Sequence, residues 1–199
     1  MNNKIKLNIA LLLVAAVCPL ASLADGYYGG IETDRNRIEV RQTDATKDAH
    51  GWALFGGDQI KPDIAAEISY RDSGQVHNPG QGRCGFIFGC VDPTYDMQSR
   101  ARMVQLSMVD SYPLAQDLRV FGRIGVSRSK VDHQFMESLG PDRGVGLSSE
   151  SKGYTHALAG LGAHYAFNKN IGLRAEYLAY ARVGPLNIST LSFGADFHF

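Results

Sequence analysis

The sequence predicts an all-β fold, an eight-stranded antiparallel up-and-down transmembrane β-barrel. Three observations lead to this prediction. The chain opens with a leader typical of exported proteins, several later segments alternate apolar and polar residues with a period of two, and the connections between these segments alternate between short and long. Together they indicate a protein that leaves the cytoplasm and forms many similar strands.

The leader has the three parts of a cleavable export signal. Lys4 and Lys6 precede the apolar stretch 7–17, and Ser22-Leu23-Ala24 supplies small residues for cleavage. We therefore expect residues 1–24 to be removed and residues 25–199 to form one barrel domain. Without Lys4 and Lys6, 18 of the 20 basic residues remain against 20 acidic ones, a balance that gives no reason to expect a nucleic-acid partner. No apolar run of about eighteen residues follows the leader, so the chain would enter a bilayer as a closed barrel.

The first two expected strands, 26–41 and 51–60, look extended, but their faces are ambiguous. Ile31 and Ile38 fall on opposite parities, which suggests a bulge or an end that lies beyond the membrane. The direction of Trp52 would fix the register, because a slip of one residue turns every side chain to the other face.

The other six strands alternate clearly. Each carries apolar residues on one face and small, polar or charged residues on the other, as expected for a strand between two different environments. They are expected at 64–71, 102–110, 118–128, 154–167, 171–181 and 187–199.

The connections alternate in length. Short links fall at 61–63, 112–116 and 168–170, whereas longer ones fall near 42–50, 73–99 and 131–153, with a modest one at 182–186. This asymmetry is typical of bacterial outer-membrane barrels. It favours a membrane barrel over a soluble lipocalin-like carrier, which the alternation alone does not exclude. An even number of strands places both termini on the short-turn side, which we expect to be periplasmic, with the long loops extracellular.

Charged residues in the middle of the strands are expected to face the lumen. Side chains fill the interior of an eight-stranded barrel, and charges buried there must be paired. Such a network would either fill and stiffen the barrel, which we favour, or gate a narrow ion pore by exchanging partners. The predicted network consists of Glu67, Arg119, Arg123, Arg174 and Glu176.

Three histidines, His156, His164 and His198, also fall on the predicted lumen face. A lipid-modifying enzyme needs its catalytic groups where lipid can reach them, and the predicted outward faces carry no Ser/His/acid set. His156 beside Thr155 is the one candidate for such chemistry. The histidines and acidic residues show no tight zinc-ligand spacing, so we expect no metal, no cofactor and no enzymatic activity.

The longest expected loop contains two cysteines, Cys84 and Cys90. In an oxidising compartment they are expected to form a disulfide. The bond would enclose an apolar knob of Phe86, Ile87 and Phe88, which either packs on neighbouring loops or forms an interaction tip.

Several stretches resemble the OmpA-like family of eight-stranded outer-membrane barrels. These are GYYGGIE at 26–32, GWALFGG at 51–57 and HYAFNKNIGLRAEYLAY at 164–180, and the resemblance covers the barrel domain without a peptidoglycan-binding domain. The tail SFGADFHF is similar to the signal by which the barrel-assembly machinery recognises members of this family. On that resemblance the assembly signal comprises Ser192, Gly194, Phe197 and Phe199.

These inferences predict a protein of the Gram-negative outer membrane. We expect a membrane-anchored structural or interaction protein, adhesin-like, that presents extracellular loops. A small diffusion pore with a charge-gated lumen is the alternative, and a lipid A-modifying enzyme ranks third. The expected partners are outer-membrane lipid and lipopolysaccharide, the assembly machinery during insertion, and a host or surface ligand of the loops; the chain is expected to be a monomer.

Overall fold

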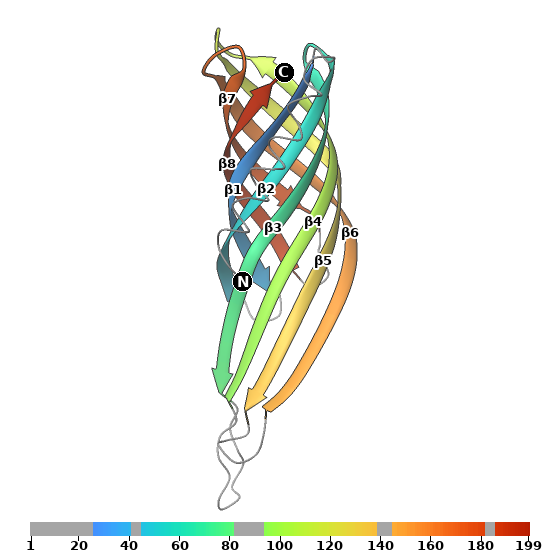
Figure 1. Ribbon diagram of the computed structural model, residues 1–199, viewed down its shortest axis with the longest axis vertical. Helices are drawn as coiled ribbons and strands as arrows, with labels where there is room; N and C mark the ends of the chain where they lie inside the picture. The colour runs from blue at the N-terminus through green and yellow to red at the C-terminus, as the bar shows by residue number, and fades with distance from the viewer. Residues whose placement is uncertain (1–25, 41–44, 82–93, 139–144, 182–185) are drawn as a thin grey trace, which may run out of the picture.

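The protein is a closed β-barrel of eight strands (Figure 1). The computed structural model describes residues 26–40, 45–81, 94–138, 145–181 and 186–199. Each strand is antiparallel to its neighbours in sequence order, so the predicted fold class is confirmed. In the described part of the chain, no helix is long and apolar enough to cross a bilayer. The strands are β1 (Tyr27–Val40), β2 (Ala45–Lys61), β3 (Ile64–Gln81), β4 (Thr94–Pro113), β5 (Leu118–Ser138), β6 (Val145–Ala166), β7 (Ile171–Tyr180) and β8 (Leu186–His198).

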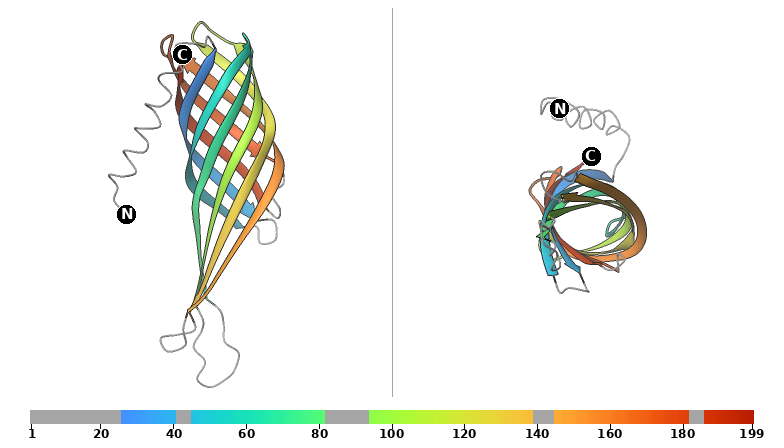
Figure 2. Two further views of the ribbon diagram at one scale, coloured as in Figure 1. Left: turned by 45° about the vertical axis from the view of Figure 1, so that its right-hand side comes forward. Right: turned by 90° about the horizontal axis from the view of Figure 1, so that it is seen from below.

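The last strand closes the barrel on the first, as the sequence predicted. β8 pairs with β1 in a continuous register from Tyr28 opposite His198 to Val40 opposite Leu186. The view along the barrel shows the closed ring (Figure 2, right). Closure pairs both edges of the sheet, which removes the exposed backbone groups that an open sheet presents.

The faces of the first two strands are now fixed. Ile31 points outward, whereas Ile38 points inward and packs against buried apolar residues. The bulge that their opposite parity suggested does not occur along β1, whose pairing with both neighbours is continuous. Trp52 and Leu54 also point outward, with 41% and 42% of their surfaces exposed.

An irregularity does occur in β3, where the register against β4 shifts between Asp72 and Gln75. Gly74 has a φ of +77° there, and a Cβ at this position would lie 1.9 Å from the backbone oxygen of His50. Only glycine fits without strain. The shift allows Arg71, Asp72 and Ser73 to be buried in succession, which strict alternation would forbid.

Four strands are much longer than expected and form an extension beyond the closed barrel. β3 pairs with β2 only as far as Asp72, and β6 pairs with β7 only from Leu158 onward. Beyond these points β3, β4, β5 and β6 continue as a tapering four-stranded sheet (Figures 1 and 2). The expected loops 73–99 and 131–153 are therefore mostly strand. We define the extension as residues 75–81, 94–100, 132–138 and 145–151.

The outer wall of the barrel carries an apolar band. Arg35 on β1, Arg102 on β4 and Arg128 on β5 are exposed outward-facing residues that end the band on the side of the extension. Exposed aromatic rings lie toward the short turns, as expected for an interfacial girdle. These rings are Tyr27, Tyr112, Tyr165, Phe167 and Phe197.

Candidate functional site

The lumen is filled by a layer of paired charges contributed by alternate strands. Its cations are three guanidinium groups and its anions are four carboxylates, all buried, so the formal charge of the layer is about −1 when every group is ionised. The members are Glu32 and Asp34 of β1, Glu67 and Arg71 of β3, Arg123 of β5, and Arg174 and Glu176 of β7.

Arg174 lies at the centre of this layer. Its guanidinium forms ion pairs with Glu32 at 3.3 Å, with Glu67 at 2.9 Å and with Glu176 at 3.1 Å. The rings of Phe55 and Phe121 lie 4.7 and 4.6 Å from the same group. Three carboxylates and two aromatic faces therefore hold one cation, a geometry that suits the planar, weakly hydrated guanidinium.

The other two guanidinium groups extend the layer on either side. Arg123 contacts Glu67 and lies 2.7 Å from Glu176. Arg71 pairs with Glu32 at 2.8 Å and also contacts Asp34. Ser192 of β8 accepts a hydrogen bond from Arg71 and donates one to Asp34, each at 2.9 Å.

The predicted network is therefore only partly the one that the structure contains. Glu67, Arg123, Arg174 and Glu176 come together, but Arg119 lies apart from them. Its side chain pairs at 2.8 Å with Asp63, beside a short turn. The alternation of residues along the strand placed Arg119 on the inner face. Alternation does not say how far along the barrel axis a residue lies.

A cluster of buried apolar side chains fills the lumen between the charged layer and the extension. Buried side chains from four strands pack together there, with Ile38 and Tyr154 against them. The Tyr180 hydroxyl accepts a hydrogen bond of 2.8 Å from Gln105, which links this cluster to the polar residues beside it. The apolar cluster consists of Met103, Leu158, Leu178, Tyr180 and Ile188.

His156 lies in the lumen beside this apolar cluster rather than at a lipid-facing rim. The histidine is 6% exposed, and its ring meets that of Tyr180 edge to face at 5.6 Å. Neither ring nitrogen has a hydrogen-bond partner among the residues that the structure describes. The neighbouring Thr155 is exposed on the other face. The one residue considered for lipid chemistry is thus held away from lipid.

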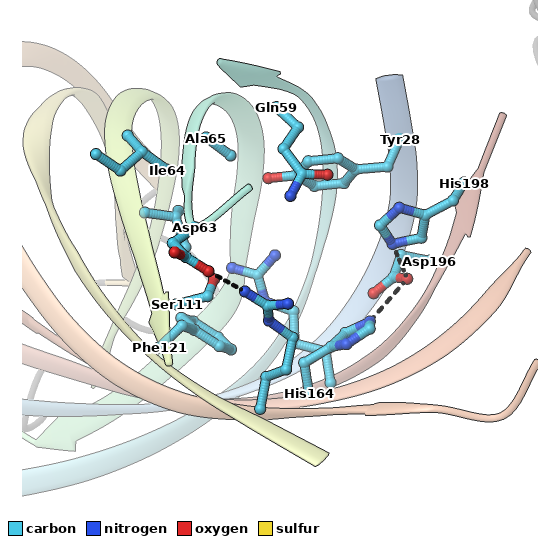
Figure 3. A pocket seen from close by; sticks show the side chains of 13 residues that line it. Tyr28, Gln59, Asp63, Ile64, Ala65, Ser111, Phe121, His164, Asp196 and His198 are labelled. Atoms are coloured by element: carbon cyan, nitrogen blue, oxygen red, sulfur yellow. Dashed lines mark hydrogen bonds and ion pairs between the residues drawn. The ribbon is translucent and has the colours of Figure 1, made fainter. Parts of the chain in front are cut away.

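A cavity of about 170 Å³ opens at the short-turn end of the lumen. Figure 3 shows Asp63 on one side of it and a group of three residues, His164, Asp196 and His198, on the other. Arg119 also lines the cavity. Both histidines place Nε2 at 3.1 Å from the same carboxylate oxygen, Oδ1 of Asp196. The sequence placed these histidines in the lumen but gave no sign that they meet.

Ion pairs also lie where the extension joins the closed barrel. Arg100 donates hydrogen bonds to both carboxylate oxygens of Asp72. Asp132 pairs with Arg102 at 3.0 Å. A hydrogen bond from Ser151, helped by Lys130 and Arg102, holds the pKa of the Asp132 carboxyl below its ordinary value.

The tail alternates as predicted. Leu191, Phe193 and Phe197 are exposed on the outer wall, while Ser192 and Asp196 are buried inside. Phe199 meets the ring of Phe197 at 5.2 Å, and its backbone N–H donates to the Tyr27 carbonyl oxygen at 3.0 Å. The predicted disulfide of Cys84 and Cys90, and the knob of Phe86, Ile87 and Phe88, lie outside the described residues.

Comparison with known proteins supplies the family. The sequence profile described as the OmpA-like transmembrane domain matches residues 26–198. Among curated relatives, outer membrane protein A of Yersinia pseudotuberculosis is 28% identical over 186 residues, and an outer membrane protein P5 of Haemophilus influenzae is 26% identical over 196. Each alignment covers 90% of this chain but only 48% and 51% of the relative, so the chain spans about half the length of these proteins.

Solved structures show the same fold at low sequence identity. The attachment invasion locus protein Ail of Yersinia pestis has a TM-score of 0.58 at 17% identity, over 88% of this chain and 100% of the other. Neisserial surface protein A has a TM-score of 0.54 at 13% identity, over 88% and 98%.

Proposed function

Because this chain belongs to the OmpA-like transmembrane domain family, and its relatives are outer-membrane proteins, we propose that it is a membrane-anchored interaction protein whose extension carries the binding function. The observation that carries the proposal is the difference in strand length. β7 has 10 residues, which suffices for a transmembrane strand, whereas β4, β5 and β6 have 20, 21 and 22. About half of each long strand is therefore available outside the bilayer.

The proposed orientation places the short turns and both termini in the periplasm and the extension outside the cell. Short turns on the periplasmic side and long excursions on the other are the rule in bacterial outer-membrane barrels. The tail would serve as the signal for the assembly machinery through Ser192, Gly194, Phe197 and Phe199.

Basic residues at the foot of the extension support contact with lipopolysaccharide. Arg102 on β4 lies opposite Lys130 on β5. Arg128 precedes Lys130 by two residues, so both side chains lie on the same outward face of β5. Arg128 has no ion-pair partner among the described side chains. Cations at the end of an apolar band meet the anionic headgroup layer of a membrane.

The filled lumen favours an anchor over a diffusion pore. A pore needs a continuous wet path, whereas here a buried charged layer and an apolar cluster follow one another along the lumen. Cells or bilayers containing the protein should therefore show no steady conductance. Steady conductance that shifts when the charges of Glu67 and Arg174 are reversed would instead support the pore.

The binding role is tested by removing the extension. Residues 75–100 and 132–151 are each replaced by a short Asn-Gly turn, and bacteria expressing either form are applied to a layer of cultured epithelial cells. A crystal structure of Ail contains the heparin analogue sucrose octasulfate, which makes this compound a useful soluble competitor. The truncated protein should remain a folded barrel and lose adhesion.

A matched control shortens the link 182–185, which joins β7 to β8 outside the extension. This variant should adhere like the full protein. Equal adhesion by the truncated and full proteins would overturn the proposal. A second arm reduces the disulfide expected between Cys84 and Cys90: lost adhesion would assign the contact to the knob at Phe86, Ile87 and Phe88, whereas unchanged adhesion would exclude the knob.

A further inference from the structure

The group His164, Asp196 and His198 is assembled by the register of three neighbouring strands. His164 lies on β6 opposite Arg174 of β7, and Gly172 of β7 lies opposite Asp196 of β8. His198 is two residues beyond Asp196, so both point to the same inner face. Residues far apart in the sequence thus converge at the short-turn mouth of the lumen (Figure 3).

Gly172 makes this convergence possible. A Cβ at this position would lie 2.1 Å from Nε2 of His164 and 2.4 Å from Oδ1 of Asp196. The strand that separates the two side chains therefore carries no side chain of its own at the crossing point, and the imidazole reaches across it. The group therefore requires glycine at position 172 as well as its three polar residues.

The two imidazoles are held in place by their surroundings. The His198 ring stacks on Tyr28 with centroids 5.2 Å apart and planes 22° apart. The hydroxyl of Tyr28 donates to Glu67 at 3.2 Å, so this ring is tied to the charged layer. Asp196 is buried, whereas His164 and His198 border the cavity and remain accessible from its mouth.

The nearby charges do not exclude a cation. Arg119 and Arg174 also line the cavity, but Arg119 pairs with Asp63 and Arg174 is surrounded by three carboxylates. The layer to which Arg174 belongs has one more carboxylate than guanidinium. The Asp196 carboxylate adds a further negative charge beside the two imidazole rings.

We propose that His164, Asp196 and His198 bind a divalent transition-metal ion of the Zn²⁺ type at the periplasmic mouth of the barrel. Two imidazole nitrogens and one carboxylate oxygen, with an open fourth position, form a donor set that Zn²⁺ accepts. The three ligand atoms lie within 4.8 Å of one another. Tetrahedral Zn²⁺ with bonds of about 2.0–2.1 Å holds its ligand atoms roughly 3.3 Å apart, so a small inward rotation of one ring completes the geometry.

Binding replaces the contacts of the two Nε2 atoms with Asp196 by bonds to the metal ion. In the metal-free state an Nε2–H of each histidine can donate to Asp196; in the bound state both Nε2 atoms coordinate the ion, and each ring keeps its proton on Nδ1. The cavity supplies the space for the water ligand at the fourth position.

The test measures Zn²⁺ binding to the untagged protein purified from outer membranes in detergent. Equilibrium dialysis against ZnCl₂ should give one ion per chain, and Co²⁺ in place of Zn²⁺ should give the visible absorption of a tetrahedral site. His198→Gln removes one ligand at a partly exposed position and should weaken binding by more than about tenfold.

Gly172→Ala is the sharper variant, because it keeps all three ligands. The added methyl displaces the ends of the His164 and Asp196 side chains rather than backbone, so the barrel should still form, as shown by its altered gel migration before and after boiling. We expect it to lose Zn²⁺ binding to the same extent. His156→Phe, which removes a lumen histidine outside the group, should bind like the wild type. The proposal is overturned if the wild type binds no Zn²⁺, or if folded Gly172→Ala and His198→Gln bind it with unchanged affinity.

Discussion

Replacing Arg174 by methionine should destabilise the barrel far more than the same change at Arg119. Both are arginines on the inner face, but Arg174 is buried among Glu32, Glu67 and Glu176, whereas Arg119 pairs with Asp63 in an exposed position. Arg174→Met changes the formal charge of the buried layer from −1 to −2. Removing one partner of a buried ion pair costs about 3–5 kcal/mol, because the remaining charges stay buried and uncompensated.

The Arg119→Met control should cost only about 0–1 kcal/mol, the range for exposed pairs. A second substitution, Glu176→Gln, returns the layer of the Arg174→Met protein to a charge of −1. The double variant should therefore recover about 1–3 kcal/mol of the loss, and the coupling energy measures the interaction directly.

The assay is equilibrium unfolding by urea in phospholipid vesicles. Trp52 is the one tryptophan of the chain and lies on the outer wall next to Tyr70, with ring centroids 5.7 Å apart, so its emission reports loss of the lipid-facing barrel. If Arg174→Met costs no more than Arg119→Met, water already solvates the charged layer. The inference of a dry, filled lumen would then fail, and the pore would become the better account.

Three further predictions concern single positions. His156→Phe should raise the free energy of unfolding in the same assay by about 1 kcal/mol, because it replaces a buried ring that has no hydrogen-bond partner among the described residues by an apolar one of similar shape; a loss of stability would show that the ring nitrogens are satisfied. Gly74→Ala should cost at least about 1–2 kcal/mol, since its φ of +77° disfavours a side chain and the methyl would strike the His50 carbonyl oxygen; an unchanged urea midpoint would contradict this. Deletion of Phe199 should lower the amount of folded protein in outer-membrane fractions, as judged by gel migration without boiling, and normal amounts would remove this residue from the assembly signal.

The sequence predicted the strands best where their two faces meet different environments. Ile124 is 69% exposed beside the buried Arg123, and the apolar–charged alternation of β5 shows this difference directly. In β1 the signal is weaker, because Thr33 and Arg35 on the outer face are as polar as Glu32 and Asp34 inside. For that reason the sequence did not predict that Glu32 and Asp34 belong to the charged layer.

The extension was missed for a related physical reason. Outside the membrane both faces of a sheet can meet water, so apolar residues need not alternate with polar ones and a strand resembles a loop in its composition. The residues 75–81 contain glycine and proline, which also indicate a turn. Only pairing with the neighbouring strand, such as Gln75 opposite Arg100, identifies this segment as part of the sheet.

The position of Arg119 and the histidine group depends on register between strands. Arg119 lies opposite His164, at the mouth, whereas Arg123 lies opposite Gly160, four residues deeper. Alternation assigns both arginines to the lumen but gives no height. The register between β6, β7 and β8 also places Asp196 within reach of His164 across Gly172. The spacing of these residues along the chain does not reveal this contact.

The order of the layers along the lumen also limits how a pore could open. Exchange of partners between Glu67, Arg123 and Arg174 would loosen only the charged layer. An ion would still meet the apolar cluster around Leu178, where it has no polar partner and where loss of its hydration shell is costly. Charge reversal at Glu67 or Arg174 alone should therefore leave the barrel non-conducting. Conduction should require a second change, such as Leu178→Ser, that wets the apolar cluster, and current through the charge-reversed protein with Leu178 intact would refute the two-barrier argument.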